Sequence, residues 1–385
     1  MKSYKILALG ASGAGKTVFL ASLYKELSTQ GKYGFYVDVE NQHQKKKLNQ
    51  IYTKIITGET WPPGTIRSEF SEWKFTCKVK NEDLNDYPAC DFTYYDYCGG
   101  RLTDTSYYDE EFDTLVRQAD SLLGLLDGQK IYGILNETNN LLSQTFLTVD
   151  LPSIIKQMQK STVPVHFIIT KWDLLSQKFT LNQVIDYLMK CDDFQELITQ
   201  RNQIESPVRL IPVSSIGAKF AQLKPDGSMK KFSGAIPQPY YTEVPIACVF
   251  PDGLKARINH IKKKQQELDK DKNKDNSFGI FFDIFNNIRP LFGIADEYLF
   301  PFLPPQYQLA KSLFYKLAPI ITQIANKQYE EMQKRTEELN RKQQESLKQV
   351  KDEETALTHA VDSFLYIQSY LNTDYPESDL SNILV

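Results

Sequence analysis

Close to its start the chain reads Lys5-Ile6-Leu7-Ala8-Leu9-Gly10-Ala11-Ser12-Gly13-Ala14-Gly15-Lys16-Thr17. The first half is an unbroken apolar run, which predicts a strand buried on both faces, as in a parallel sheet. The second half has the spacing Gly-x-x-x-x-Gly-Lys-Thr, the pattern of a phosphate-binding loop. Apolar residues at 20, 23, 24 and 27 then follow the spacing of one helix face. A strand, a glycine-rich turn and a helix therefore occur in the order that phosphate binding requires.

Each part of this loop is suited to hold a nucleoside triphosphate. Its glycines let backbone N–H groups approach phosphate oxygens without a Cβ in the way, and the helix adds its positive dipole end. Lys16 is expected to reach the β- and γ-phosphates, and the Thr17 hydroxyl to bind Mg²⁺, which prefers oxygen ligands. The alternative is a glycine-rich turn that binds nothing, which the flanking strand and helix disfavour. The residues expected to contact the nucleotide here are Ser12, Gly13, Ala14, Gly15, Lys16, Thr17 and Val18.

A second motif, Asp96-Tyr97-Cys98-Gly99, ends another predicted strand, residues 90–95. From the end of a strand, Asp96 can hold Mg²⁺ through water, while the Gly99 amide can donate to the γ-phosphate. D-x-x-G alone is a weak signal. The competing interpretation is a strand-ending aspartate that caps the next turn.

The third and fourth motifs concern the base. Thr170-Lys171-Trp172-Asp173 follows a predicted strand over residues 165–169. The Asp173 carboxylate can accept two hydrogen bonds from guanine N1–H and the 2-amino group, a pair of donors that adenine lacks. Lys171 can lay its aliphatic stem along the purine. After a strand over residues 208–213, Ser214, Ser215 and Ile216 can place backbone amides near guanine O6. The sequence therefore predicts a guanine nucleotide.

The order of these four motifs resembles the Ras-like, translation-factor (TRAFAC) class of P-loop GTPases over about residues 4–250. Residues 9–20 and the Trp-Pro-Pro-Gly-Thr loop at 61–65 look like GTPases of prokaryotic conflict or signalling systems, including the double-GTPase group. The resemblance implies GTP or GDP and Mg²⁺ as ligands, with Lys16, Thr65 and Gly99 in catalysis and Thr17, Thr65 and Asp96 at the metal. Thr60 is the rival of Thr65, and the loop could instead be a structural corner.

Two positions depart from this class. Thr170 stands at the usual asparagine, which leaves the Asp173 contacts intact. Gly100 stands where Ras-like enzymes keep a water-positioning glutamine, so hydrolysis is expected to be slow, on the order of 10⁻³ s⁻¹ or below. Arg101 is either an arginine supplied in cis or an ordinary surface cation. A protein partner or a second GTPase, including a second copy of this chain, could complete the site.

The length and overall composition limit the classes of protein and the cellular location that are expected. The chain has 385 residues, which suggests two domains or one large domain with an appendage. Its net charge of -3 gives no drive toward nucleic acid or an anionic membrane. Five cysteines without C-x-x-C spacing argue against a disulfide framework or a zinc site. The first strand begins at once and no apolar run reaches the ~18 residues of a membrane span. A cytoplasmic protein is expected.

We predict an α/β fold over residues 1–253, a P-loop NTPase with a mostly parallel central sheet flanked by helices. An inserted hairpin is expected around Pro225-Asp226-Gly227, and an edge strand over residues 245–250. Residues 254–277 are expected to form a charged helix end and linker. Residues 278–385 are expected to be α-helical, with one long helix from Ile320 to about Leu371.

The long helix carries two apolar series with heptad spacing. They are Met332 and Leu339, and then Val350, Leu357, Phe364 and Leu371, eleven residues out of phase, which we interpret as a stutter in a coiled-coil-like stripe. The half after Val350 is expected to be packed, and the half before it mostly exposed.

The Phe-rich stretch at residues 278–317 has two interpretations, a membrane-inserting paddle and a small helical core or cover. Interrupting charges and the absence of a Lys/Arg cluster favour the second, so a membrane is not expected as a partner. The function expected from all these features is a GTP-dependent molecular switch with slow hydrolysis. The alternatives are an ATPase of the same fold, a nucleotide-stabilised scaffold without turnover, and a membrane-associated GTPase.

Overall fold

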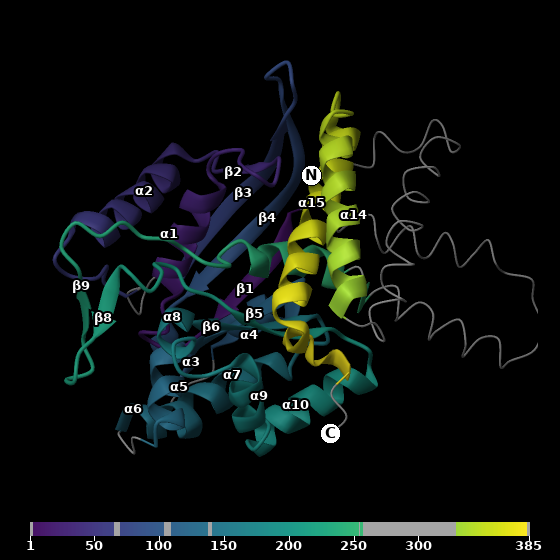
Figure 1. The fold of residues 1–385 in the computed structure, drawn as a ribbon. Helices are drawn as coiled ribbons and strands as arrows, with labels where there is room; N and C mark the ends of the chain where they lie inside the picture. The colour runs from purple at the N-terminus through teal and green to yellow at the C-terminus, as the bar shows by residue number, and fades with distance from the viewer. Residues whose placement is uncertain are drawn as a thin grey trace, which may run out of the picture.

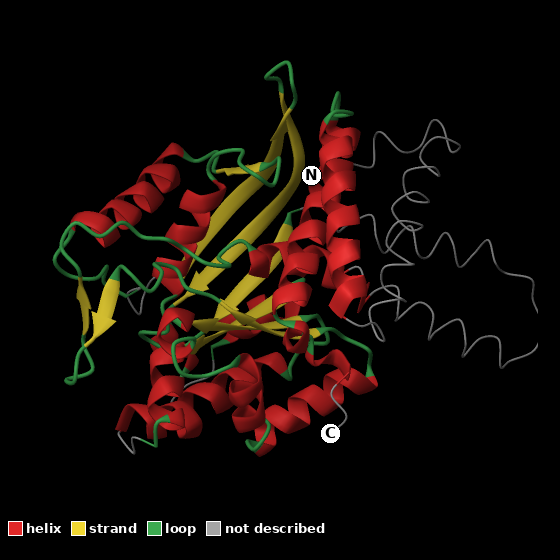
Figure 2. Cartoon of the chain, in the orientation of Figure 1, coloured by secondary structure: helices red, strands yellow, loops and turns green. Residues whose placement is uncertain are grey.

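The computed structural model describes residues 3–64, 70–103, 109–137, 141–253, 255–256 and 329–382. These residues form a seven-stranded sheet with helices on both faces (Figures 1 and 2). The α/β class and the mostly parallel sheet are therefore confirmed. Thr65 and residues 257–328 lie outside the described residues. Residues 257–328 include most of the predicted linker, the whole Phe-rich stretch and the start of the predicted long helix.

The sheet has the strand order β2-β3-β4-β1-β5-β6-β7. Strands β4, β1, β5, β6 and β7 are parallel, whereas β2 and β3 run antiparallel to their neighbours. Every residue of β5 and β6 is buried, as expected of parallel strands covered on both faces. The strands are β1 Tyr4–Leu9, β2 Tyr36–Asp38, β3 Phe70–Lys80, β4 Asp86–Tyr97, β5 Ser121–Asp127, β6 Val165–Thr170 and β7 Val208–Pro212.

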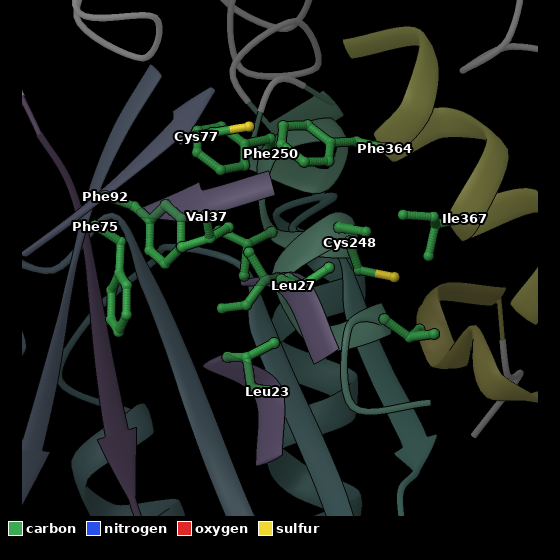
Figure 3. Close-up of a cluster of buried hydrophobic side chains, with 14 of the residues drawn as sticks. Leu23, Leu27, Val37, Phe75, Cys77, Phe92, Cys248, Phe250, Phe364 and Ile367 are labelled. Carbon is green, nitrogen blue, oxygen red and sulfur yellow. The ribbon is translucent and has the colours of Figure 1, made fainter. Parts of the chain in front are cut away.

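The sheet has a hydrophobic core on each face, and alternate residues of β1 point into one core or the other. Ile6 and Ala8 pack with the helices at residues 16–27 and 42–57 and with the C-terminal helices. Leu7 and Leu9 pack on the other face with the helices at residues 110–118, 151–158, 181–188 and 192–203. In Figure 3 Phe250 lies against Phe364 of α15, and their rings stack with centroids 5.1 Å apart. The longer helices are α1 Lys16–Leu27, α2 Gln42–Thr57, α4 Glu110–Gln118, α5 Gly128–Leu135, α7 Leu151–Met158, α9 Leu181–Leu188, α10 Asp192–Gln203, α14 Tyr329–Leu347 and α15 Glu353–Asp374. The shorter helical segments are α3 Gly99–Leu102, α6 Leu141–Thr145, α8 Trp172–Leu175, the π-helix Phe146–Asp150 and the 3₁₀ turns Pro376–Ser378 and Leu380–Asn382.

The prediction of one long C-terminal helix is wrong. Two helices, α14 and α15, lie side by side as a hairpin (Figure 1). Asp352 starts α15 with a capping box, accepting from the Thr355 N–H at 2.8 Å while the Thr355 hydroxyl oxygen accepts from the Asp352 N–H at 3.1 Å. The phase jump in the heptads marks this turn and not a stutter, because the cap begins a new helix. Burial follows the expectation, since α15 is mostly buried and α14 mostly exposed.

The insertion after β7 is partly as predicted. Strands β8 Ala221–Leu223 and β9 Met229–Lys231 pair antiparallel around a turn in which Gly227 has φ +80°. Residues 244–253, however, form a helix and not an edge strand. Pro245 lies in its first turn, where its missing N–H is not needed. A short apolar run is compatible with a buried helix as well as with a strand, so its pattern could not separate the two.

The α14–α15 hairpin is tied to the loop before β2 by buried polar groups. Gln343 Nε2 donates to the Tyr33 carbonyl at 2.8 Å, and the Ser363 hydroxyl donates to the same oxygen at 2.9 Å. His359 Nε2 lies 3.1 Å from the Gly34 carbonyl. Leu357 and Phe364 belong to the same buried cluster as Ile6, so the described C-terminal helices share a core with the sheet.

Acid should destabilise this contact. Burial lowers the pKa of His359 from 6.5 to about 4. Between these values the unfolded chain binds the extra proton, so the free energy of unfolding falls as the pH drops from 6.5 to 4. The difference corresponds to roughly 3 kcal/mol at most. We expect His359→Gln to flatten the stability–pH curve in this window, and the exposed His43→Gln to leave it unchanged. Urea unfolding at several pH values measures both; a His359→Gln curve parallel to wild type would contradict the prediction.

Candidate functional site

A cavity of about 410 Å³ lies at the carboxyl edge of the sheet, at the ends of β1, β6 and β7. The chain leaves β1 toward β2, β3 and β4 on one side and continues from β4 to β5 on the other. Such a point is where open α/β sheets bind ligands, and the volume suits a small molecule. Its lining residues are Ser12, Gly13, Gly15, Lys16, Thr17, Val18, Trp61, Pro62, Pro63, Gly64, Gly99, Thr170, Lys171, Asp173, Ser215, Ile216 and Met229.

The backbone of the loop after β1 has the conformation that its glycines predict. Gly13 and Gly15 have φ values of +84° and +87°, a region that other residues avoid. Gly15 is the N-cap of α1 and offers no side-chain cap, so the N–H groups of the first turn have no side-chain acceptor from that position. An anion held at this turn would meet these N–H groups and the positive end of the helix dipole.

Lys16 folds back over its own loop. Its Nζ donates to the Gly10 carbonyl at 2.6 Å and to the Ala11 carbonyl at 3.3 Å, and the side chain is buried. Burial lowers the pKa of this ammonium, and the negative charge of Asp96 opposes the shift. A phosphate oxygen would be a stronger acceptor for this donor than either carbonyl.

The predicted metal residues differ in how they meet the cavity. Thr17 lines it, and Asp96 is buried at the end of β4, paired in register with Ala8 of β1. Among the described residues no group of three His, Cys, Asp or Glu side chains could hold a metal ion. A hydroxyl and one carboxylate instead fit Mg²⁺, which takes its other ligands from water and substrate phosphates. Thr65 lies outside the described residues, and its rival Thr60 is exposed and does not line the cavity.

Gly99 packs directly on the loop at residues 10–17. A Cβ at this position would lie 2.4 Å from the Ala11 carbonyl carbon and from the Ser12 nitrogen. No other residue could bring the first turn of α3 so close, which gives this predicted site residue a steric reason to be glycine. The backbone of Gly99 therefore borders the cavity beside the loop.

The aspartate predicted to read the base is joined to the loop after β7. Asp173 Oδ1 accepts a hydrogen bond of 2.5 Å from the Ser214 hydroxyl, whose oxygen accepts from the Gly217 N–H at 2.9 Å. Burial raises the pKa of the Asp173 carboxyl. Ser214 does not itself line the cavity, so its described role is to hold Asp173, while Ser215 and Ile216 face the space. The Ser22 hydroxyl fixes this loop to α1 through the Ser215 carbonyl at 2.8 Å.

The two residues before Trp172 connect the base motif to its neighbours. Lys171 has φ +53°, a conformation that costs energy for a residue with a Cβ, and its Nζ lies 2.8 Å from an oxygen of Asp127. Asp127 also caps α5, so the lysine is held at the end of β5. The Thr170 hydroxyl donates to the Ala14 carbonyl at 2.9 Å and lies within 3.1 Å of the Leu126 carbonyl. Thr170 thus ties the loop at residues 10–17 to β5 and β6.

One wall of the cavity was not predicted. Trp61 Nε1 donates to the Met229 carbonyl of β9 at 2.9 Å, so the Trp-Pro-Pro-Gly loop rests on the inserted hairpin. Lys231 lies 4.8 Å from the centre of the Trp61 ring and donates to the Gly58 carbonyl at 2.7 Å. Sequence reasoning assigned no chemistry to the hairpin, and nothing in the local pattern of Met229 indicates that it reaches a ligand site. For Trp61, the sequence signal that could have indicated a place at the site was an aromatic residue directly before two prolines.

Arg101 does not line the cavity. Its Nε donates to Asp109 at 2.9 Å and its guanidinium lies 4.6 Å from the centre of the Tyr97 ring. The Arg101 side chain is therefore paired with Asp109. This pairing favours the interpretation that Arg101 is an ordinary cation of its loop over the interpretation that it is a catalytic arginine supplied in cis.

A second titratable cluster is structural. Ser121 Oγ lies 3.1 Å from His166 Nδ1, and His166 Nε2 lies 2.9 Å from Asp252. The partners are those of a Ser-His-Asp triad, but the two ring nitrogens are exchanged relative to a catalytic triad. All three side chains are fully buried and none lines the cavity. Arg209 Nε also donates to Asp252 at 2.6 Å and holds the pKa of that carboxyl well below its usual range. This network joins β5, β6 and β7 to the helix at residues 244–253.

The structure therefore brings residues of all four motifs to one cavity, although the D-x-x-G motif reaches it only through Gly99. Of the predicted residues, Ala14, Ser214 and Asp96 lie behind the lining and Thr65 is outside the described residues. No protein-family model matches the chain, and no curated protein matches it. Within the described ranges, no helix combines the length and apolar composition that crossing a membrane would require.

Proposed function

We propose that the protein binds a guanine nucleotide with Mg²⁺ and hydrolyses GTP slowly, as a P-loop GTPase of the Ras-like class that switches a protein partner. One observation carries this proposal: a single cavity is lined by the phosphate loop, by Lys171 with Asp173, and by the segment at Ser215. The first can hold phosphates, the second can accept guanine donors, and the third can offer backbone N–H groups to guanine O6. The finer placement among prokaryotic conflict-system or double-GTPase proteins rests on motif resemblance.

The residues have separate tasks in this reaction. Lys16 and the first turn of α1 would bind the β- and γ-phosphates, and Thr17 and Asp96 would hold the metal site. When bound, Mg²⁺ neutralises charge that develops on the phosphate oxygens. The Gly99 backbone borders the place where a γ-phosphate would lie, and water attacks in line with the bond that breaks. Readout would run through residues 57–67 and 96–113 to the helical region or the partner.

Two features favour slow turnover. Gly100 has no side chain to orient water, and Arg101 is held by Asp109 away from the cavity lining. The same features favour the second candidate, a nucleotide-stabilised scaffold without turnover. A protein partner or a second GTPase, including a second copy of this chain, would supply the missing group. A membrane-associated GTPase would depend on residues 278–317, all of which lie outside the described residues.

The deciding experiment is the affinity of the purified, nucleotide-free protein for GTP, GDP and ATP with Mg²⁺, together with the nucleotide released when fresh protein is denatured. We expect guanine nucleotides in both measurements and at least tenfold weaker ATP binding. Equal binding of ATP would favour an ATPase of the same fold. Retained GTP with no turnover at any protein concentration would favour the scaffold. Binding of neither purine would overturn the proposal.

A further inference from the structure

The C-terminal end of α15 lies against the base motif. Tyr375 follows the last residue of α15, and its phenol oxygen accepts a hydrogen bond from Trp172 Nε1 at 3.1 Å. The two rings meet edge to face, with centroids 6.1 Å apart at 83°. Trp172 is buried and stands directly before Asp173, so this bond fixes the backbone from which the base-reading carboxylate projects.

The same phenol also contacts Tyr240, whose backbone pairs with the segment after β7. The Tyr240 hydroxyl donates to Tyr375 Oη at 3.2 Å. The backbone of Tyr240 pairs with that of Ser214 through two bonds: the Tyr240 N–H donates to the Ser214 carbonyl at 2.7 Å, and the Ser214 N–H donates back at 3.0 Å. A phenol oxygen can accept two hydrogen bonds, and Tyr375 accepts one from Trp172 and one from Tyr240, the backbone partner of Ser214.

Thus the segments at Asp173 and Ser214 are joined twice. At the cavity the Ser214 hydroxyl donates to Asp173 at 2.5 Å, and behind it Trp172, Tyr375 and Tyr240 form a second bridge. Tyr241 strengthens the second bridge, because its ring stacks on Tyr240 with centroids 4.1 Å apart and its hydroxyl bonds to Asp374 of α15. The end of α15 therefore contacts Trp172 directly and contacts the Tyr240–Tyr241 pair, which is joined to Ser214.

We propose that Tyr375 is a positioning residue for guanine recognition, and that docking of the α15 end and binding of the base strengthen each other. The inference rests on the proposed function. By holding Trp172 and Tyr240 together, the phenol presets the distance between the Asp173 and Ser214 segments before a base enters. Coupling between two binding events is reciprocal, so a bound guanine nucleotide also stabilises the docked helix end.

The test compares Tyr375→Phe with Tyr370→Phe. The first variant keeps the ring packing and removes the acceptor. The second removes a hydroxyl from α15 itself, from a ring that packs edge to face on Tyr241 with centroids 5.9 Å apart. We expect Tyr375→Phe to raise the Kd of GTP and of GDP by the same factor, roughly fivefold to tenfold. ATP binding and kcat at saturating GTP should not change, so the GTP-over-ATP preference falls by that factor. Tyr370→Phe should match wild type.

A second measurement needs no variant. In wild-type protein, GDP should slow amide hydrogen exchange over residues 371–378 relative to the nucleotide-free state. The positioning role is wrong if wild type binds GTP but Tyr375→Phe keeps the wild-type Kd for GTP and the GTP-over-ATP preference. It is also wrong if GDP does not change amide exchange at residues 371–378. In both cases the proposed function stands. If wild type binds no guanine nucleotide, the proposed function fails first and this inference falls with it.

Discussion

Asp173→Asn is expected to weaken GTP binding by roughly 100-fold or more and to create binding of xanthosine triphosphate. The carboxylate accepts from Ser214 and lines the cavity, where it can accept from guanine N1–H and the 2-amino group. Hydrogen bonds to a charged acceptor contribute about 1.5–3 kcal/mol each, so losing two of them costs at least about 3 kcal/mol. The amide nitrogen of asparagine is a donor and would face the 2-amino group of guanine, which is also a donor. Xanthine has a carbonyl at this position, which can accept a hydrogen bond from the amide.

Titration calorimetry with GTP and xanthosine triphosphate measures both changes. The exposed Asp186→Asn is the matched control and should bind GTP as wild type does. The gain of the second ligand separates altered base recognition from a folding defect, because a misfolded variant binds neither. Unchanged GTP affinity in Asp173→Asn would mean that this carboxylate does not read the base.

Lys16→Ala should reduce GTP turnover by at least about 100-fold, the loss typical for one preorganised donor at a transition state. The buried ammonium is held by carbonyls of its own loop at 2.6 and 3.3 Å, and burial lowers its pKa. A phosphate would replace these neutral acceptors with a charged one. Since ligand binding stabilises the folded state, GTP should raise the melting temperature of wild type and have little effect on the variant.

Phosphate release and thermal unfolding with and without GTP test this expectation. Lys25 is an exposed lysine on the same helix, and Lys25→Ala should keep both the turnover and the thermal shift. Full turnover in Lys16→Ala would show that the loop at residues 10–17 does not serve as a phosphate site.

Local signals predicted most of the site. The order of apolar strand, glycine turn and amphipathic helix depends on neighbours in sequence, and the observed β1, Gly15 and α1 follow it. Polar residues at the carboxyl ends of β6 and β7 were placed together because the ends of parallel strands share one edge of a sheet. For this reason Asp173 and Ser215 could be assigned to one cavity from the sequence, without a structure.

Long-range packing could not be predicted in the same way. The contact of Trp61 with Met229 and that of Trp172 with Tyr375 join residues far apart in sequence, and no periodicity reports such pairs. The helix at residues 244–253 was mistaken for a strand because a short apolar run fits both. The break before α15 was visible as a change of phase, but a cap and a stutter leave similar traces in a heptad pattern.

The shared core of the sheet and α15 has a consequence during synthesis. The ribosome completes the whole sheet long before it makes α15, so the apolar residues that pack on Phe364 lack this partner until α15 emerges. Such a nascent intermediate is prone to self-association, and its base site lacks Tyr375. A copy cut short before residue 353 would therefore be a substrate for chaperones and proteases.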